Sequence, residues 1–168
     1  MKIGLAADHS GYALKENIKP FLTSMGYLVI DFGAHYFNEL DDYSDTVIPM
    51  ARAIHNKKIK RGIAICGSAI GSSIAANKIQ GVRAALVSDH FAAHQGVEND
   101  NMNLLCLGGT LLSYATAKEL IKLFLEATFT NEKKHVRRLQ KILSLEHMIS
   151  VADHNVGTKR NRSSLNRK

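Results

Sequence analysis

Short apolar segments and amphipathic helical segments alternate along almost the whole chain. The strand-like runs span residues 2–7, 27–32, 62–66, 82–87 and 103–107. The helical patterns span residues 12–25, 45–56, 72–78, 92–97 and 115–127, with a last helix over 132–149. A helix between successive strands is typical of a parallel sheet covered on both faces. The alternation therefore predicts an α/β fold: a Rossmann-like three-layer α/β/α sandwich with a five-stranded parallel sheet and an extra C-terminal helix.

Composition and charge change sharply near the end of the chain. With 168 residues, 45% of them hydrophobic, the chain is long enough for one domain with a substantial core, which we expect over residues 1–150. Residues 151–168 carry five Lys or Arg side chains against one Asp, so they contribute +4 of the net charge of +7. Few of them are apolar, and such a segment buries too little surface to offset its ordering entropy. We predict a basic, disordered C-terminal tail.

The same features bear on partners and location. A basic tail can hold RNA, but this one has no aromatic side chain to stack on bases, so we expect no nucleic-acid partner. No stretch approaches the roughly 18 apolar residues of a membrane span, and no basic segment leads into a signal core, which predicts a cytoplasmic protein without a membrane contact. The two cysteines, Cys66 and Cys106, end separate strand-like runs, and we expect free thiols and no metal or cofactor.

Polar residues stand directly at the ends of three predicted strands. They are Asp8, His9 and Ser10 after the first strand, Cys66 and Ser68 at the third, and Ser88 and Asp89 after the fourth. Ligands of open parallel sheets bind outside the carboxyl ends of the strands. We therefore expect these residues to line one crevice.

Cys66 ends an apolar run and is followed by a turn of small residues, 67–71, that opens the next helix. Free backbone amides and the helix dipole at such a junction attract phosphate or a developing oxyanion, and they should lower the pKa of the thiol. A free cysteine at a strand end is also commonly a small buried hydrophobe, which is what we expect of Cys106. For Cys66 the residues alone leave both interpretations open. The turn lacks the lysine and the spacing of a nucleotide-binding P-loop.

Two further groups of residues allow two interpretations each. Asp8 and His9 suit either the cap of the following helix or acid–base chemistry. The basic side chains of the last helix suit either a phosphate or a solvated helix surface, because residues three and four apart share a face. They are Lys133, Lys134, His135, Arg137 and Arg138.

Four segments together resemble the type B ribose-5-phosphate isomerase family. They are residues 3–12 (IGLAADHSGY), 42–45 (DYSD), 66–86 (CGSAIGSSIAANKIQGVRAAL) and 103–109 (NLLCLGG). The resemblance implies a metal-independent enzyme of the pentose phosphate pathway that interconverts D-ribose 5-phosphate and D-ribulose 5-phosphate. It also implies the same sandwich fold, assembled as a homodimer or a dimer of dimers in which both chains contribute to each site.

The resemblance implies roles for individual residues. Cys66 matches the base that moves a proton between C1 and C2 of the sugar through an enediol(ate) intermediate. The backbone amides of Gly67 to Ser72, including that of Gly71, would bind the developing charge, and Ser68 keeps the hydroxyl of the family's usual threonine. The contacts to sugar and phosphate would come from Asp8, His9, Tyr43, Lys134 and Arg137, with His135 beside Arg137.

The chain departs from the family pattern near the end of the helix predicted over 92–97. Asn99 stands where the family usually has the histidine that opens the sugar ring. Asparagine cannot titrate, so ring opening would be slower or would pass to His9. Asp100 replaces a common asparagine of the substrate site.

Three other departures concern the phosphate and the turn. Lys134 replaces a frequent arginine, which keeps the charge but loses the bidentate fork. Thr110 replaces an arginine and removes a cation. Ala69 replaces a glycine of the turn, and we expect it to be tolerated because the position should not require a positive φ.

The sequence leaves two other functions open. A related hexose-6-phosphate isomerase, for allose or galactose 6-phosphate, would use the same cysteine motif with a deeper pocket. A non-catalytic sugar-phosphate sensor would keep the fold and the anion site but lose turnover through Asn99 and Thr110, although the retained Cys66 argues against it.

Overall fold

The computed structural model describes residues 1–146, and within them it has the predicted five-stranded parallel sheet. The strands are β1 (Lys2–Ala7), β2 (Leu28–Asp31), β3 (Arg61–Cys66), β4 (Ala84–Leu86) and β5 (Leu104–Gly108). The helices between and after them are α1 (His9–Ser24), α2 (Tyr43–His55), α3 (Ile70–Ala76), α4 (His90–Asp100) and α5 (Tyr114–Glu126). Each strand pairs in parallel with its neighbours in the order β2-β1-β3-β5-β4. The fold prediction is confirmed.

Element bounds differ from the predicted ones where side chains act on the backbone. Helix α1 begins at His9 rather than residue 12, because the Asp8 carboxylate accepts a hydrogen bond from the Gly11 amide (3.0 Å) and caps the first turn. Strand β4 is shorter than predicted. The amide of Arg83 donates to the side chain of Asn103 (2.8 Å) instead of to a strand partner.

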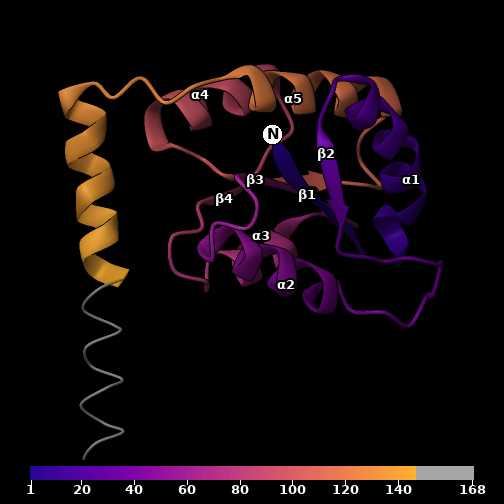
Figure 1. Ribbon diagram of the computed structural model, residues 1–168. Coiled ribbons are helices and arrows are strands. Elements are labelled where there is room, and N and C mark those ends of the chain that lie inside the picture. Colours follow the sequence, from indigo (N-terminus) through magenta and orange to yellow (C-terminus); the bar gives the residue numbers. More distant parts are fainter. Residues whose placement is uncertain (147–168) are drawn as a thin grey trace, which may run out of the picture. The chain divides into compact units, whose positions relative to one another are not determined.

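Helices cover both faces of the sheet (Figure 1). Alternate residues of a strand point to opposite faces, so Leu5 and Ile63 join a core with α1, α4 and α5, whereas Ala6 and Ala64 join a second core with α2 and α3. Burying both faces of the sheet explains why its strands are apolar throughout and not merely at every second position. The two cores confirm the three-layer sandwich.

The strands β1 and β3 lie side by side inside the sheet, and the order in which the chain adds further strands reverses between them. From β1 the chain passes to β2 on one side, and from β3 it passes to β4 and β5 on the other. A parallel sheet opens a crevice at such a switch point, outside the carboxyl ends of the two strands. Asp8 and Cys66 stand at these two ends.

Gly11 brings α1 directly onto the end of β3. A Cβ atom on this residue would lie 1.8 Å from the carbonyl oxygen of Ile65 and 3.1 Å from the amide nitrogen of Cys66. Contacts this short exclude every side chain, so only glycine permits this approach. The first turn of α1 is therefore held beside Cys66.

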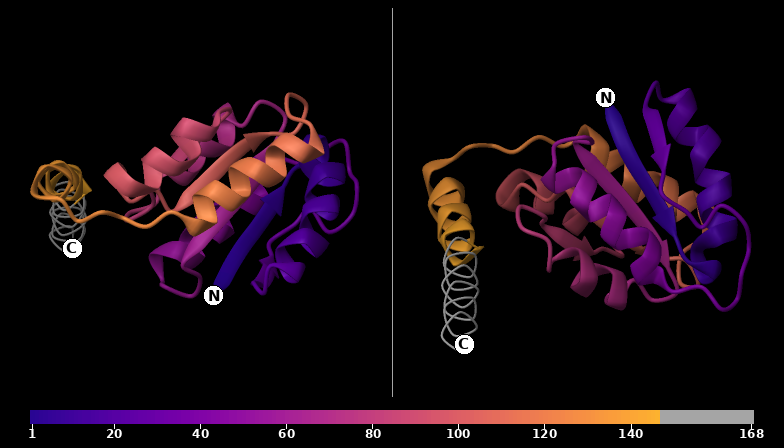
Figure 2. Two further views of the ribbon diagram at one scale, coloured as in Figure 1. Left: turned by 90° about the horizontal axis from the view of Figure 1, so that it is seen from above. Right: turned by 60° about the horizontal axis from the view of Figure 1, so that its bottom comes forward.

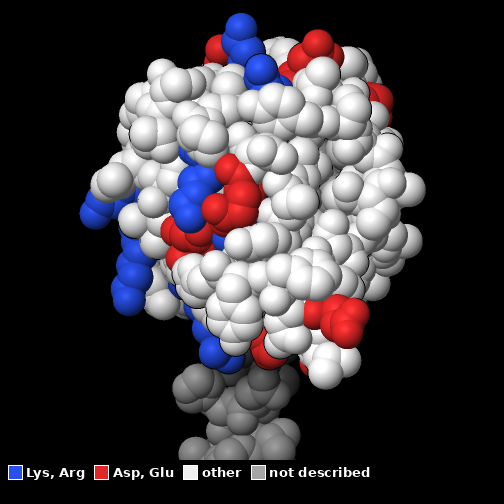
Figure 3. All heavy atoms as spheres, turned by 90° about the vertical axis from the view of Figure 1, so that its right-hand side faces the viewer, with Lys and Arg blue, Asp and Glu red and all other residues white. Residues whose placement is uncertain are grey.

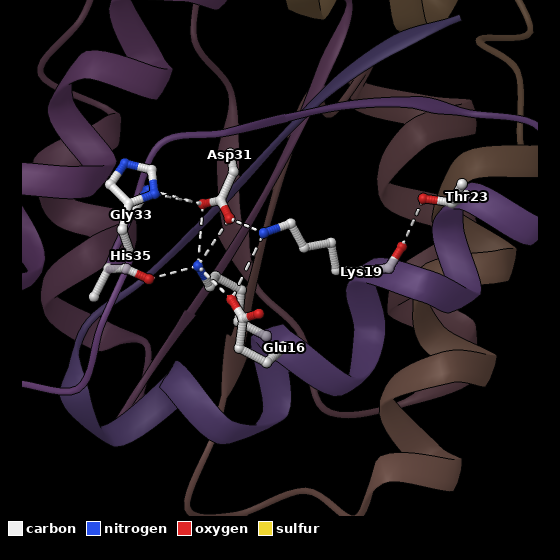
Figure 4. Close-up of polar contacts among 8 residues, drawn as sticks. Glu16, Lys19, Thr23, Asp31, Gly33 and His35 are labelled. Atoms are coloured by element: carbon white, nitrogen blue, oxygen red, sulfur yellow. Dashed lines mark hydrogen bonds and ion pairs between the residues drawn. The ribbon is translucent and has the colours of Figure 1, made fainter.

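A fully buried lysine ties α1 to the end of β2. The Lys15 ammonium contacts both carboxylate oxygens of Asp31 (3.0 and 3.1 Å) and donates to the carbonyl of Ala34 (2.5 Å). Lys19 and Glu16 complete the cluster, Lys19 contacting Asp31 from the more exposed side (Figure 4). On the face of the molecule that carries α1, basic and acidic groups accordingly lie next to one another (Figure 3).

Residues 131–146 belong to a second compact unit, distinct from Met1–Thr130 (Figure 2). Residues 133–146 are helical, which agrees with the predicted C-terminal helix. The predicted tail at 151–168 lies outside the described residues, and the expected domain limits of 1–150 and 151–168 stay a prediction. Among the helices described, none is both long and apolar enough to cross a membrane.

We expect Lys15→Ala to lower the free energy of unfolding by about 3 kcal/mol or more, because it leaves the buried side of Asp31 and the Ala34 carbonyl without their donor. Lys19→Ala is the matched control, since Lys19 bonds the same carboxylate from a position that is 40% exposed. Its loss should be at most about 1 kcal/mol. Urea unfolding of both variants measures the difference, and equal losses would contradict the role assigned to Lys15.

Candidate active site

The thiol of Cys66 lies at the switch point, and its residue is only 3% exposed. Burial raises the pKa of Cys66 to about 11, because the thiolate loses its hydration. A hydrogen bond with the Ser72 side chain and one with the Asp8 backbone lower the pKa, but they do not offset burial and the negative charges of Asp8 and Asp41. The predicted lowering of this pKa is therefore wrong. Cys106 is buried completely, as expected.

The turn after Cys66 is held by its carbonyl groups. The Gly109 amide donates to the Cys66 carbonyl (2.8 Å), and the Thr110 hydroxyl donates to the Gly67 carbonyl (2.9 Å). Because the C=O and N–H of one trans peptide point in opposite directions, the amides of Gly67 and Ser68 point away from residues 109–110. Thr110, which lacks the charge of an arginine, thus braces the turn.

Ala69 has a left-handed backbone conformation with a φ of 65°. The expectation that this position does not require a positive φ is wrong. The chain reverses sharply between β3 and α3, and Ala69 provides the reversal. An alanine in this region costs roughly 1–2 kcal/mol relative to its preferred conformation. The alanine is thus accommodated with strain, which the surrounding structure offsets.

Asp8 and His9 lie at the end of β1 with different partners. Asp8 is buried and caps α1, so the helix-cap interpretation describes its side chain. The backbone amide and the Nδ1 atom of His9 both contact Oδ1 of Asp41, at 2.9 and 2.8 Å. The hydrogen bond with Asp41 raises the pKa of His9, whose side chain is 34% exposed. His9 is thus a partly exposed titratable group at the crevice.

Sequence reasoning missed Asp41. It lies in the irregular segment between β2 and α2, residues 32–42, where no periodicity distinguishes it from the neighbouring acidic residues Glu39 and Asp42. Its second carboxylate oxygen is buried and has no hydrogen-bond partner among the described residues. The signal that could have found it is its position two residues before Tyr43, in a connection that starts at the end of β2 and therefore lies at the carboxyl edge of the sheet.

Tyr43 and Gly71 meet at the rim of the same crevice. A Cβ atom on Gly71 would lie 2.5 Å from Cζ of the Tyr43 ring, so the ring at the start of α2 packs on the first turn of α3. From the other side, a Cβ atom on Gly67 would lie 3.6 Å from the side chain of Ser10. The structure therefore brings the ends of β1 and β3 and the starts of α2 and α3 together. The predicted site residues at this edge are Asp8, His9, Tyr43, Cys66, Gly67, Ser68, Gly71 and Ser72.

Asn99 and Asp100 lie at the opposite edge of the sheet. They end α4, and the carbonyl of Asn103, just beyond them, accepts from the amide of Gly62 near the start of β3 (2.9 Å). Gly62 precedes Cys66 by four strand residues, or about 13 Å. Within one chain these two residues therefore do not reach the crevice. Asp89, predicted to line it, accepts a hydrogen bond from the Ala92 amide (2.8 Å) and caps α4.

The predicted phosphate ligands belong to the second unit. Lys134 contacts Glu132 at 3.0 Å, and Nε2 of His135 lies 3.9 Å from the same carboxylate. Arg137 lies one turn further along the helix and is exposed. Their role stays a prediction. Among the residues described, no three His, Cys, Asp or Glu side chains are grouped so that they could hold a metal ion.

Comparison with known proteins gives consistent results. Residues 3–142 match the family described as ribose/galactose isomerase. The fold is similar to ribose-5-phosphate isomerase B of Clostridium thermocellum, with 40% identity, a TM-score of 0.85 and coverage of 89% of this chain and 99% of that chain. The same enzyme of Mycoplasma genitalium, solved with bound ribulose-5-phosphate, is 36% identical, with a TM-score of 0.83 and coverage of 87% and 96%.

One similar protein carries a different substrate in its name. The D-erythrulose-4-phosphate isomerase of Pectobacterium atrosepticum is 33% identical over 147 residues, which are 88% of this chain and 96% of that protein. The relatives therefore share a reaction type and differ in sugar length. The matched region contains β2 to β5, β1 except for its first residue, and all the residues that meet at the crevice. On this evidence of sequence, fold and site, the chain belongs to the ribose/galactose isomerase family.

Proposed function

We propose that this chain is a metal-independent aldose–ketose isomerase that interconverts D-ribose 5-phosphate and D-ribulose 5-phosphate, with Cys66 as the base. The observation that carries the proposal is the position of Cys66 at the carboxyl end of β3, next to the end of β1 and directly before the turn of small residues that starts at Gly67. The relative from Mycoplasma genitalium with bound ribulose-5-phosphate supports the choice of a five-carbon substrate.

The reaction moves one proton between neighbouring carbons. The Cys66 thiolate removes the proton from C2 of the open-chain aldose, and the electron pair of that bond passes through C1 to the carbonyl oxygen. The resulting enediolate carries its charge on oxygen, where the amides of the turn stabilise it. The O2 proton then passes to O1, the thiol returns its proton to C1, and the C2–O2 bond becomes the carbonyl of the ketose, which leaves Cys66 as the thiolate. Because burial raises the pKa of Cys66 to about 11, the groups that donate to its sulfur determine how readily the thiolate forms.

Ring opening needs an acid and a base before isomerisation begins. Asn99 cannot supply either, because an amide side chain does not titrate. His9 is a partly exposed titratable side chain at the crevice, and its bond to Asp41 favours the protonated imidazolium. We assign to His9 the protonation of the ring oxygen.

A complete site requires a second copy of the chain. Asn99 and Asp100 lie at the edge of the sheet opposite Cys66. We therefore propose a homodimer, or a dimer of dimers, in which one chain supplies Cys66, His9 and the turn. The partner supplies Asn99, Asp100 and the phosphate ligands Lys134 and Arg137.

Sugar length is the least constrained part of the proposal. Thr110 stands where the family commonly has an arginine, so one cation that could bind the phosphate is missing. One relative acts on a four-carbon sugar phosphate according to its name. Turnover of erythrulose 4-phosphate or allose 6-phosphate in preference to ribose 5-phosphate would mean that the enzyme acts on a sugar phosphate of another length. Binding of these compounds without turnover would favour the sensor alternative.

We expect Cys66→Ala to abolish isomerisation of ribose 5-phosphate and to leave the fold intact, since it removes the proton acceptor and only a sulfur atom from the core. Cys106→Ala is the matched control, because Cys106 is a buried thiol on the next strand and takes no part in the reaction. The assay follows ribulose 5-phosphate, with circular dichroism as the check on folding. Turnover by Cys66→Ala would mean that another residue is the base.

The bond between His9 and Asp41 predicts a pH effect. Asp41→Asn should lower the pKa of His9 because it removes the hydrogen bond and negative charge that stabilise the imidazolium. The pair adds stability at low pH, and this contribution disappears as the pH rises through the pKa of His9 in the folded state. NMR titration of the His9 ring measures the shift. Glu119→Gln, which breaks the similar exposed pair with His90, should leave His9 unchanged.

A hybrid dimer tests the shared site. We expect Cys66→Ala and Arg137→Ala each to lose most activity, and a purified hybrid with one chain of each kind to regain about half of the unmodified activity. The reason is that one of its two equivalent sites then contains neither substitution. Tandem affinity tags on co-expressed chains isolate the hybrid. An inactive hybrid would show that Cys66 and Arg137 serve the same site from one chain.

A further inference from the structure

Within residues 1–146, the side chain of Asp41 makes hydrogen bonds only with His9. Its Oδ1 atom accepts from the His9 backbone amide at 2.9 Å and lies 2.8 Å from the ring nitrogen Nδ1. The other carboxylate oxygen, Oδ2, is buried and has no hydrogen-bond partner among these residues. A buried charged oxygen without a donor lowers the stability of a fold. Stability alone therefore does not explain a carboxylate at this position.

Asp31 shows how a structural carboxylate of this protein is bonded. One of its oxygens accepts from the Lys15 ammonium and from the Gly33 amide, at 3.1 and 2.9 Å, and the other contacts Lys15 and Lys19. Both oxygens thus have donors, which come from α1 and from the end of β2. Asp41 has donors on one oxygen, and both donors belong to a single residue. Its carboxylate therefore acts on His9 and not on the packing of several elements.

The shared oxygen fixes both the orientation and the proton of the His9 ring. An oxygen that is held by the backbone amide reaches Nδ1 of the same residue only when that edge of the ring turns towards the backbone. An ionised carboxylate can only accept, so Nδ1 carries the ring proton. Nε2 then faces away from Asp41. It has no partner within residues 1–146 and is not one of their buried polar atoms, so it is accessible from the crevice side of the ring.

The pair of His90 and Glu119 lacks this constraint. Its side chains also approach to 2.8 Å, but they are 59% and 64% exposed, against 34% and 16% for His9 and Asp41. Among the described residues, the His90 amide makes no bond to Glu119. An exposed ion pair of this kind leaves the ring free to turn and contributes little. The His9 ring, by contrast, is held at two points.

We propose that Asp41 is a positioning residue for opening the sugar ring: it keeps a proton on Nδ1 of His9, so that Nε2 both gives a proton to the sugar and takes one back. The inference rests on the isomerase function and the role of His9 proposed above. In ribose 5-phosphate, O1 and the ring oxygen O4 are bonded to the same carbon, so one nitrogen can serve both. The acid for ring opening then lies in the same chain as Cys66, and no titratable group is needed at Asn99.

Ring opening returns His9 to its starting state. The Nε2–H bond of the imidazolium breaks and its proton goes to O4, while the C1–O4 bond breaks and leaves its electron pair on O4. A lone pair of O1 forms the C1=O1 double bond. The O1 proton then passes to Nε2, whose lone pair is available because the neutral ring keeps its proton on Nδ1. The sugar is now the open-chain aldehyde on which Cys66 acts.

The tautomer of His9 is measured in the full-length protein without sugar. Proton–nitrogen correlation NMR spectra of the ring, at a pH above the raised pKa of His9, distinguish a protonated ring nitrogen from a bare one. We expect the proton on Nδ1 in the unmodified protein and a mixture of tautomers in Asp41→Ala. Glu39→Ala, which removes an exposed carboxylate of the same segment, should keep the proton on Nδ1. A proton on Nε2 in the unmodified protein would overturn the proposal without recourse to any variant.

Ring opening itself is followed by NMR exchange spectroscopy between the two anomers of ribose 5-phosphate, which interconvert only through the open chain. Asp41→Ala should slow the exchange that the protein catalyses about tenfold or more, whereas Glu39→Ala should leave it unchanged. Isomerisation of 4-deoxyribose 5-phosphate, which lacks the hydroxyl that closes the ring, should be nearly unaffected by Asp41→Ala. Equal losses on the two sugars would show that Asp41 does not act through ring opening.

Failure of the proposed function gives a different result. If the unmodified protein isomerises no sugar phosphate, the isomerase function is refuted, and the tautomer of His9 still decides whether Asp41 positions the ring. If the protein isomerises ribose 5-phosphate and Asp41→Ala leaves the anomer exchange unchanged, the function stands and the role of Asp41 is refuted.

Discussion

The site depends on the close contact between the first turn of α1 and the end of β3. Gly11 allows the helix backbone to reach the carbonyl of Ile65, and Asp8, three residues earlier, caps the same turn. The contact holds the first turn of α1, which begins at His9, against the end of β3, where Cys66 stands. Lys15, one turn further along α1, fastens this helix to Asp31 and to the carbonyl of Ala34, which lies in the same irregular segment as Asp41. The two anchors therefore hold the elements that meet at the crevice in one arrangement.

The chemistry of the crevice follows from a conflict between burial and charge. A sulfur at the end of a buried strand is protected from solvent, but the same burial opposes its ionisation. The donors around it, Ser72 and the Asp8 amide, act against that cost. His9 is in the opposite situation, since it lies at the surface with a carboxylate that favours its charged form. The two groups are thus suited to different proton transfers within a single crevice.

The β-α connections of a parallel sheet also place far apart, within one chain, residues that the family resemblance assigns to the same active site. A helix that follows a strand returns to the amino-terminal edge of the sheet, so Asn99 and Asp100 at the end of α4 lie away from Cys66. No local adjustment of one chain bridges this distance, because the sheet and both cores would have to change. The shared site that we propose between two copies would satisfy the same chemistry without altering the fold.

The sequence by itself determined the layer architecture, the strand order along the chain and the edge where the crevice lies, because burial on both faces of a sheet leaves a clear hydrophobic pattern. It also indicated Cys66, Asp8 and His9, which follow strands directly. Tertiary structure alone decided the partner of His9, the left-handed conformation of Ala69 and the raised pKa of Cys66. These three properties depend on distances between segments far apart in the chain and on the exclusion of water. A linear pattern contains neither quantity.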